Sequence, residues 1–202
     1  RYGGAVAIPD EVTQQFSAKI APNKLSIAKA AAQLIKDHNR IIIDSGTTTS
    51  GLIAELNHKR GLVVMTNALH LANAIHELEN EPTLLMTGGT WDPHSKSFQG
   101  QVAEQVLRSY NFDQLFIGAD GIDLARGTTT FNELTGLSKV MAEVSREVIV
   151  MVDSDKIGKR IPNLELPWSQ ISVLVTDERI EESALNQITE QGVKVILAPY
   201  SP

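Results

Sequence analysis

The sequence of 202 residues contains no cysteine, which excludes disulfide bonds, thiolate metal sites and a cysteine nucleophile. Aromatic residues make up only 5% of the chain, and no apolar run approaches the roughly 18 residues that a membrane span needs. Positive charge is not in excess either, because the formal net charge is -6 at pH 7. Binding a nucleic acid backbone requires a basic face, so we expect any DNA contact to come from outside this segment.

Several catalytic and metal-binding motifs are also missing. The 5 histidines show neither an HxxxH pair nor the carboxylate-flanked spacing of a metal site, so we predict no metal. There is no GxSxG nucleophile elbow, and no stretch matches the P-loop or the GxGxxG dinucleotide pattern. These absences argue against ATP and NAD, and we expect no cofactor.

The remaining composition is that of an ordinary globular domain, with 42% hydrophobic and 21% charged residues. Short apolar runs alternate with amphipathic ones, and two long loops are expected, one before the helix at 135–146 and one after the strand at 148–152. The pattern predicts strands at 40–44, 62–65, 83–86, 114–117, 148–152, 173–176 and 193–197, and helices at 23–38, 50–56, 69–78, 102–110, 135–146 and 182–191. This βαβα alternation predicts an α/β, Rossmann-like fold, with an open, mostly parallel sheet and helices on both faces.

The stretch from Ile41 to Ser50 passes from three isoleucines into a run of hydroxyl side chains. Consecutive β-branched residues indicate a strand that is covered on both faces, as in a parallel sheet. Gly46 permits a tight turn, and the hydroxyls lie beside the free amides of the following helix, which together would form an anion cradle. We therefore predict that a phosphate group is bound by Asp44, Ser45, Gly46, Thr47, Thr48 and Thr49. The alternative is an ordinary turn with a Ser/Thr helix cap, and this stretch alone favours neither.

Four further predicted strands are followed by small, hydroxylated or charged residues. Because ligands lie outside the carboxyl ends of parallel strands, these segments should meet around one site. Turns are rich in Gly, Asp, Asn and Ser in any case, but the convergence of donors, acceptors and one lysine on one edge favours a ligand site. The candidates are Asn67, Gly88, Gly89, Asp120, Gly121, Asp153 and Lys156.

Each candidate also has a purely structural interpretation. Asn67 could cap the helix that follows it, and the glycine pair 88–89 could serve only a tight turn. Glu133 and Lys139 could be solvated helix residues, and they can face the site only if Glu133 lies at or before the helix start. Lys156 could be a surface residue or could neutralise a phosphate as a point charge.

An ordered series of short motifs runs along nearly the whole chain. The motifs are Gly3-Gly4-Ala5, Asn23-Lys24 with Ile27-Ala28, Asp44-x-Gly-Thr-Thr, Thr66-Asn67, Gly88-Gly89, Gly118-x-Asp-Gly and Asp153-Ser-x-Lys156. Taken together, they resemble the effector-binding domain of the DeoR family of bacterial sugar-operon repressors. Within that family, the sequence is most similar to repressors of glucitol (sorbitol) operons.

The resemblance implies a cytoplasmic transcription regulator whose sensor domain is similar in fold to ribose-5-phosphate isomerase. Residues 1–22 would be an irregular linker from a missing N-terminal helix-turn-helix domain, packing back on a sensor domain of residues 23–202. The effector would be a phosphorylated sugar or sugar alcohol, such as glucitol 6-phosphate. Operator DNA would be bound through the missing domain, and the protein would form a homodimer or homotetramer.

Family roles carry over onto the matching positions. The resemblance implies a phosphate loop at Ser45, Gly46, Thr47, Thr48 and Thr49, sugar-facing residues at Asp120, Gly121, Glu133 and Lys139, and residues of the inducer response at Lys24, Asp153 and Lys156. The segment Thr135-Gly-Leu departs from the acidic, alanine-rich helix start of the family. The role of Glu133 therefore depends on where this helix begins.

The alternative is a sugar-phosphate isomerase or deaminase on the same scaffold. Such an enzyme needs a general base beside the substrate carbon, which Asp120, Asp123 or Glu133 could supply. The related isomerases place a denser acidic cluster after that strand, whereas Gly121 and Ile122 intervene here. We therefore predict a sensor and no enzymatic activity, chiefly on the family resemblance.

Overall fold

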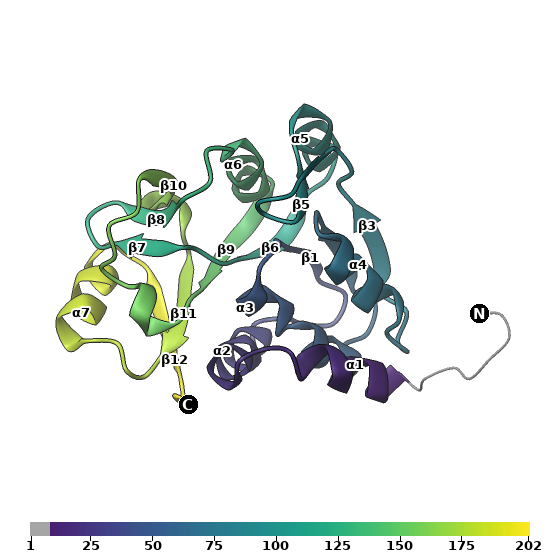
Figure 1. Ribbon diagram of the computed structural model, residues 1–202, viewed down its shortest axis with the longest axis horizontal. Coiled ribbons are helices and arrows are strands. Elements are labelled where there is room, and N and C mark those ends of the chain that lie inside the picture. The colour runs from purple at the N-terminus through teal and green to yellow at the C-terminus, as the bar shows by residue number, and fades with distance from the viewer. Residues whose placement is uncertain (1–8) are drawn as a thin grey trace, which may run out of the picture.

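The computed structural model of the protein describes residues 9–202. Its centre is a seven-stranded, all-parallel sheet in the order β12-β11-β9-β6-β1-β2-β3 (Figure 1). The strands are β1 (Arg40–Ile43), β2 (Val63–Thr66), β3 (Thr83–Met86), β6 (Phe112–Ile117), β9 (Ser145–Met151), β11 (Val173–Asp177) and β12 (Lys194–Ala198). The predicted α/β fold with an open parallel sheet is confirmed.

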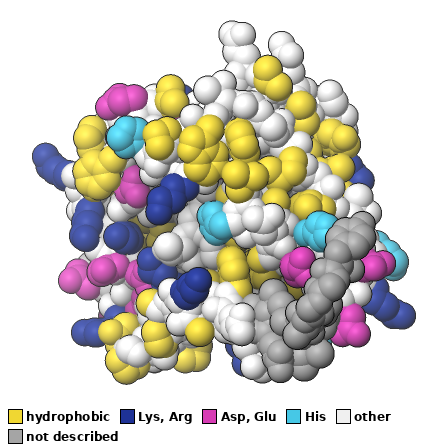
Figure 2. Space-filling view, turned by 45° about the vertical axis from the view of Figure 1, so that its right-hand side comes forward, with side chains coloured by type: hydrophobic (Ala, Val, Ile, Leu, Met, Phe, Trp, Pro, Cys, Tyr) yellow, Lys and Arg dark blue, Asp and Glu magenta, His cyan; other side chains and the backbone are white. Residues whose placement is uncertain are grey.

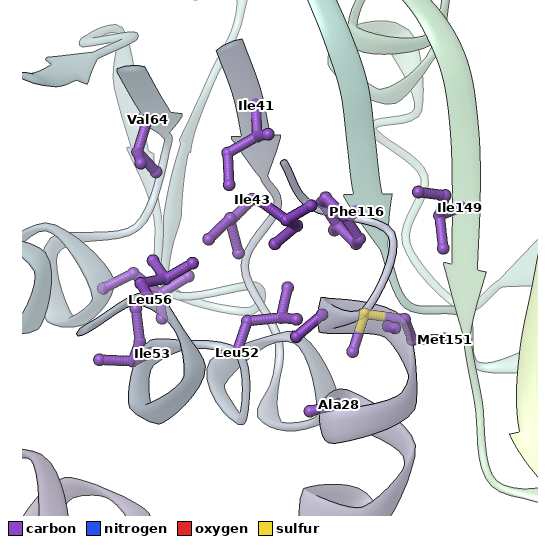
Figure 3. Packing of buried hydrophobic residues seen from close by; sticks show 14 of the residues in the cluster. Ala28, Ile41, Ile43, Leu52, Ile53, Leu56, Val64, Phe116, Ile149 and Met151 are labelled. Carbon is purple, nitrogen blue, oxygen red and sulfur yellow. The ribbon is translucent and has the colours of Figure 1, made fainter. Parts of the chain in front are cut away.

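Alternate residues of β1 face opposite layers of the molecule. Ile41 and Ile43 pack with Leu52 and Phe116 in one hydrophobic cluster (Figure 3), whereas Ile42 belongs to the cluster on the other face. All three isoleucines are completely buried. The triple isoleucine is therefore the sequence of a strand that is covered on both sides.

Helices cover both faces of the sheet, with α2 and α3 on one side of β1 and α5 and α6 on the other (Figure 1). The elements of the first layer are α1 (Pro9–Ser17), α2 (Pro22–Ala32), α3 (Thr47–Ser50), the 3-10 helix η1 (Ile53–His58) and α4 (Leu69–His76). Those of the second layer are α5 (Gln101–Arg108), α6 (Gly136–Glu143) and α7 (Glu182–Glu190).

The N-terminal segment differs from the expected irregular linker. Residues 9–17 form α1, since a proline suits the first turn of a helix. This helix lies against η1 and α4, and the Asn57 side-chain amide donates a 3.4 Å hydrogen bond to the Thr13 hydroxyl. The predicted helix at 23–38 ends early, at Ala32, and His38 takes a left-handed backbone conformation with φ 67° that a helix cannot continue through. The Gly3-Gly4-Ala5 motif lies outside the described residues.

The two predicted long loops, and the segment between β3 and α5, contain strands that the sequence pattern did not indicate. A second, antiparallel sheet forms from β7 (Gly121–Asp123), β8 (Gly127–Thr130) and β10 (Asn163–Pro167), and a hairpin forms from β4 (Thr90–Asp92) and β5 (Ser97–Gln99). These strands have three to five residues each, too few for a clear alternation of apolar side chains. Gly127 is required there, because a Cβ atom would lie 2.1 Å from the Leu166 carbonyl oxygen.

The surface carries mixed charge. On the face shown in Figure 2, lysine and arginine side chains lie mostly on the left and are interspersed with carboxylates, and hydrophobic side chains gather in the upper half. Over the described part of the chain, every helix is too short or too polar to span a membrane.

Candidate functional site

A cavity of about 750 Å³ lies at the carboxyl ends of the central strands. The strand order reverses between β1 and β6, and residues that follow both strands line the cavity, among them Ser45 and Ala119. Such a reversal leaves a crevice in open α/β sheets, where ligands usually bind. The volume lies in the usual range of small-molecule sites.

The loop after β1 is held in shape by its own side chains. The Thr49 hydroxyl donates to the carbonyl oxygens of Asp44 at 2.8 Å and Gly46 at 3.2 Å, and the Ser50 hydroxyl also donates to Gly46. Gly46 takes φ 149°, a conformation that favours glycine. Because Thr49 and Ser50 are engaged inside the loop, Ser45, Thr47 and Thr48 supply the loop hydroxyls that remain for a ligand.

The helix after this loop is shorter than expected. A continuous helix at 50–56 is wrong: α3 ends at Ser50, and the chain continues as the 3-10 helix η1. Close packing on α2 accompanies the break, because a Cβ atom on Gly51 would lie 2.7 Å from the Ala28 Cβ atom. Attraction of an anion therefore depends on the loop amides and hydroxyls, and on Lys24, whose Nζ donates a 2.7 Å hydrogen bond to the Thr47 hydroxyl.

Asp44 and Asn67 lie at the base of the loop. Burial raises the pKa of Asp44 to about 6, although the Ser45 amide and the Asn67 side chain oppose this shift. Asn67 is completely buried, accepts a 3.2 Å hydrogen bond from the Ser45 amide and donates to the Phe98 carbonyl oxygen at 3.4 Å. It does not cap α4 and does not line the cavity, so its role is to hold the loop in place.

A second part of the cavity lining, the acidic wall, consists of carboxylates from outside the loop. Asp120 follows β6, and its Oδ2 accepts hydrogen bonds from the Thr130 hydroxyl and the Phe131 amide, both at 2.9 Å. Glu133 also lines the cavity, because α6 begins only at Gly136 and leaves this residue ahead of the helix. Both carboxylates can accept hydrogen bonds from ligand hydroxyls.

A third group of residues joins the cavity to α2. Asp153 and Lys156 line the cavity after β9, and Asn23 donates hydrogen bonds to Asp153 Oδ1 at 2.7 Å and Asp177 Oδ2 at 3.0 Å. Asn23 is not the helix cap, a position that Ala21 occupies. Burial raises the pKa of Asp177, but hydrogen bonds from Ser154 and Asn23, among others, hold it below its usual value.

Comparison with known proteins agrees with this architecture. Residues 20–178 match the model of the DeoR C terminal sensor domain. The chain belongs to the DeoR family. A putative aga operon transcriptional repressor of Escherichia coli O157:H7 is 40% identical to this chain over 204 residues, which cover 97% of this chain and 75% of that protein. The HTH-type transcriptional regulator IolR of Bacillus subtilis (strain 168) is 28% identical over 201 residues, 98% of this chain and 80% of that protein. The family is one of transcriptional regulators.

Solved structures share the fold at low sequence identity. A D-ribose-5-phosphate isomerase in complex with phospho-erythronic acid matches with a TM-score of 0.50 and 18% identity, over 69% of this chain and 55% of that one. eIF2B delta from Chaetomium thermophilum matches with a TM-score of 0.54 and 15% identity, over 80% of this chain and 58% of that one. The sensor domain therefore spans little more than half of these structures, and the likeness shows the fold alone.

The cavity of the sensor domain gathers most of the residues that the sequence singles out. Those that line it are Lys24, Asp44, Ser45, Gly46, Thr47, Thr48, Thr49, Asp120, Glu133, Asp153 and Lys156. Those that do not are Asn67, Gly88, Gly89, Gly121 and Lys139.

The glycines outside the lining serve close packing or a turn instead. A Cβ atom on Gly89 would lie 2.6 Å from the Gln99 carbonyl oxygen, and one on Gly121 would lie 2.7 Å from Ile161 Cγ1. Gly88 takes φ 61°, which favours glycine in the turn after β3. Lys139 is exposed on α6.

The β4–β5 hairpin supplies cavity residues that the sequence did not indicate. Asp92, His94 and Ser95 line the cavity, and Asp92 accepts hydrogen bonds from the His94 amide at 3.0 Å and the Ser95 hydroxyl at 2.8 Å. Hydrogen bonding by Ser95 is the main cause of the lowered pKa of Asp92.

Within residues 9–202, no group of three His, Asp or Glu side chains could hold a metal ion.

A second missed residue is Glu165 on β10, which is only 9% exposed and lines the cavity. Its Oε2 accepts a 3.2 Å hydrogen bond from the hydroxyl of Ser138 on α6. A signal was present in the sequence, since a glutamate lies between Leu164 and Leu166. It does not identify a site residue, because the apolar run around it is too short to predict a strand.

Proposed function

We propose that this domain binds a phosphorylated sugar or sugar alcohol and thereby controls a cytoplasmic DNA-binding repressor of a sugar or hexitol operon. Glucitol 6-phosphate is one candidate effector. Operator DNA is bound through an N-terminal helix-turn-helix domain that residues 1–22 connect to the sensor domain of residues 23–202. The net charge of -6 supports DNA binding by the other domain, because a chain with this charge is not suited to bind a polyanion.

The distribution of charge in the cavity carries the proposal. The cavity lining includes the hydroxyls and amides of residues 45–48, with Lys24 bonded to Thr47, and Lys156 after β9, and these donors suit a phosphate. The acidic wall presents the carboxylates of Asp120 and Glu133, which suit hydroxyl groups. A molecule with a phosphate at one end and hydroxyls at the other complements both groups of residues.

Thermal melting tests the proposal. The domain is heated with glucitol 6-phosphate, glucose 6-phosphate and fructose 6-phosphate, and with glucitol, glucose and fructose as matched controls without phosphate. A ligand that binds only the native state raises the midpoint by mass action. We expect a shift with at least one phosphorylated compound and none with its unphosphorylated partner. The absence of a shift with all three phosphates would refute the proposal.

A sugar-phosphate isomerase or deaminase is the second candidate. The observation that favours it is a pair of cavity carboxyls, Asp44 and Glu165, whose pKa values are raised by burial to about 6 and about 8 and so lie near neutral pH. Incubation with ribose 5-phosphate or glucosamine 6-phosphate, followed by product analysis, tests it. Turnover that Asp120→Ala abolishes would support the enzyme over the sensor.

A further inference from the structure

Glu165 occupies an irregular position in the second sheet. The pairing of β10 with β8 shifts register between Leu164 and Leu166, so Glu165 is the additional residue of a β-bulge. Bulges redirect a side chain, and they are common beside functional sites. Here the redirected side chain is an acid that lines the cavity, although more than nine-tenths of its surface is buried.

The carboxyl of Glu165 is only partly satisfied by the protein. The Ser138 hydroxyl, which donates to Oε2, is its one hydrogen-bond partner among residues 9–202, and no lysine or arginine in this part of the chain forms an ion pair with it. The second carboxyl oxygen therefore remains available.

The surroundings of Glu165 disfavour its negative charge. Burial, together with the charges of Asp44 and Asp120, raises its pKa to about 8, although the Ser138 hydrogen bond and the charge of Lys139 act in the opposite direction. Both carboxylates line the same cavity. At pH 7, the Glu165 side chain is mostly a carboxylic acid, with a proton to donate.

We propose that Glu165 recognises the effector directly, as an uncharged carboxylic acid whose second oxygen donates a hydrogen bond to a hydroxyl oxygen of the bound sugar phosphate. The inference rests on the proposed function, since it assigns a residue for the polyol part of that ligand. It adds a specificity-determining contact from β10, separate from the phosphate loop after β1. Inorganic phosphate, which has no polyol part, does not use this contact.

The proposal makes binding depend on pH in one direction. Below pH 8 the acid donates its hydrogen bond, and above pH 8 it becomes a carboxylate beside Asp44, Asp120 and an anionic ligand. The phosphate does not contribute to this change, because its second pKa is near 6. The affinity of the wild type for the sugar phosphate should therefore fall about tenfold between pH 7 and pH 9.

Calorimetric titration at pH 7 and pH 9 tests the inference with glucitol 6-phosphate, glucose 6-phosphate and inorganic phosphate as probes. Glu165→Gln retains a donor that does not titrate, so it should bind the sugar phosphates at pH 7 about as well as the wild type and lose the fall at pH 9. Glu165→Ala should weaken sugar phosphate binding about tenfold at pH 7 and leave inorganic phosphate unaffected. Glu147→Gln is the matched control, because Glu147 is partly buried, accepts a hydrogen bond from Gln114 and does not line the cavity.

The outcomes separate the inference from the function on which it rests. If neither sugar phosphate binds the wild type, the proposed function and the inference fall together. If one binds but Glu165→Gln shows the same fall at pH 9 as the wild type, the inference alone is overturned. Equal losses of sugar phosphate and inorganic phosphate binding in Glu165→Ala would also overturn it. Should Glu165→Ala not fold, the pH profile of Glu165→Gln still decides.

Discussion

The two walls of the cavity are built in different ways. Residues 44–50 form a contiguous loop that is fixed by hydrogen bonds within itself, such as that from Thr49 to Asp44, and by Asn67 beneath it. The acidic wall is assembled from segments far apart in the chain, with Asp120 after β6 and Glu165 on β10. We infer that the loop recognises the phosphate common to many effectors, whereas the acidic wall recognises the part that varies among them.

The largest expected effect comes from placing a negative charge in the loop. Thr48→Asp puts a carboxylate where the phosphate dianion would lie, and the like charges repel in a partly desolvated site. We expect the affinity for the sugar phosphate and for inorganic phosphate to fall at least about 100-fold. The melting temperature should change little, since the Thr48 side chain is partly exposed and lines the cavity. Calorimetric titration measures the affinities.

Thr48→Ser is the control for this change because it keeps the hydroxyl. It should bind both ligands within about threefold of the wild type. Equal affinities of the wild type and folded Thr48→Asp would rule out the phosphate assignment of the loop.

A change on the acidic wall should separate the two kinds of recognition. Asp120→Ala removes an acceptor for ligand hydroxyls, and we expect about tenfold weaker binding of glucitol 6-phosphate with no change for inorganic phosphate. Asp123→Ala is the matched control, because Asp123 bonds to Arg126 and does not line the cavity. Calorimetry with both ligands provides the comparison. A parallel loss of both affinities in Asp120→Ala would show that the two walls do not act separately.

The contact between α2 and the strand ends should affect stability. Asn23→Ala removes the hydrogen bonds to Asp153 and Asp177, and we expect about 2 kcal/mol less stability at pH 7 by urea unfolding. The pKa of Asp177 is lowered in the folded state, so its contribution is present above its unfolded pKa and is lost as pH falls through the folded value. The difference between Asn23→Ala and the wild type should therefore shrink below about pH 4. An equal difference at pH 3 and pH 7 would contradict this account.

Assembly is the prediction least connected with the two walls. A repressor of a two-fold operator needs paired readers, and the sensor domain is large enough to pair them. We expect a homodimer or homotetramer in sedimentation velocity without DNA, with little change on adding ligand. Monomer alone at high micromolar concentration would exclude this assembly.

Much of this arrangement could be predicted from local sequence. The strand before Asp44 was recognisable because three isoleucines leave no polar face, and the loop was recognisable because Gly46 and the hydroxyls are adjacent in the chain. The parallel sheet followed from the βα alternation. In a parallel sheet the carboxyl ends of the strands lie at the same edge, which is independent of the side chains that follow them. The end of α3 was missed because it depends on the contact of Gly51 with Ala28.

The sequence by itself determined the layer architecture and the family, because both depend on patterns within a few tens of residues, and it predicted a phosphate-binding loop after β1. Only the tertiary structure decided which acids face the cavity. Pairing of β8 with β10 joins residues more than thirty positions apart and turns Glu165 inward at a bulge. Burial and the neighbouring charges of Asp44 and Asp120 then raise the pKa of Glu165. The sequence does not show this burial or these neighbours, because the contacts exist only after the two sheets have packed.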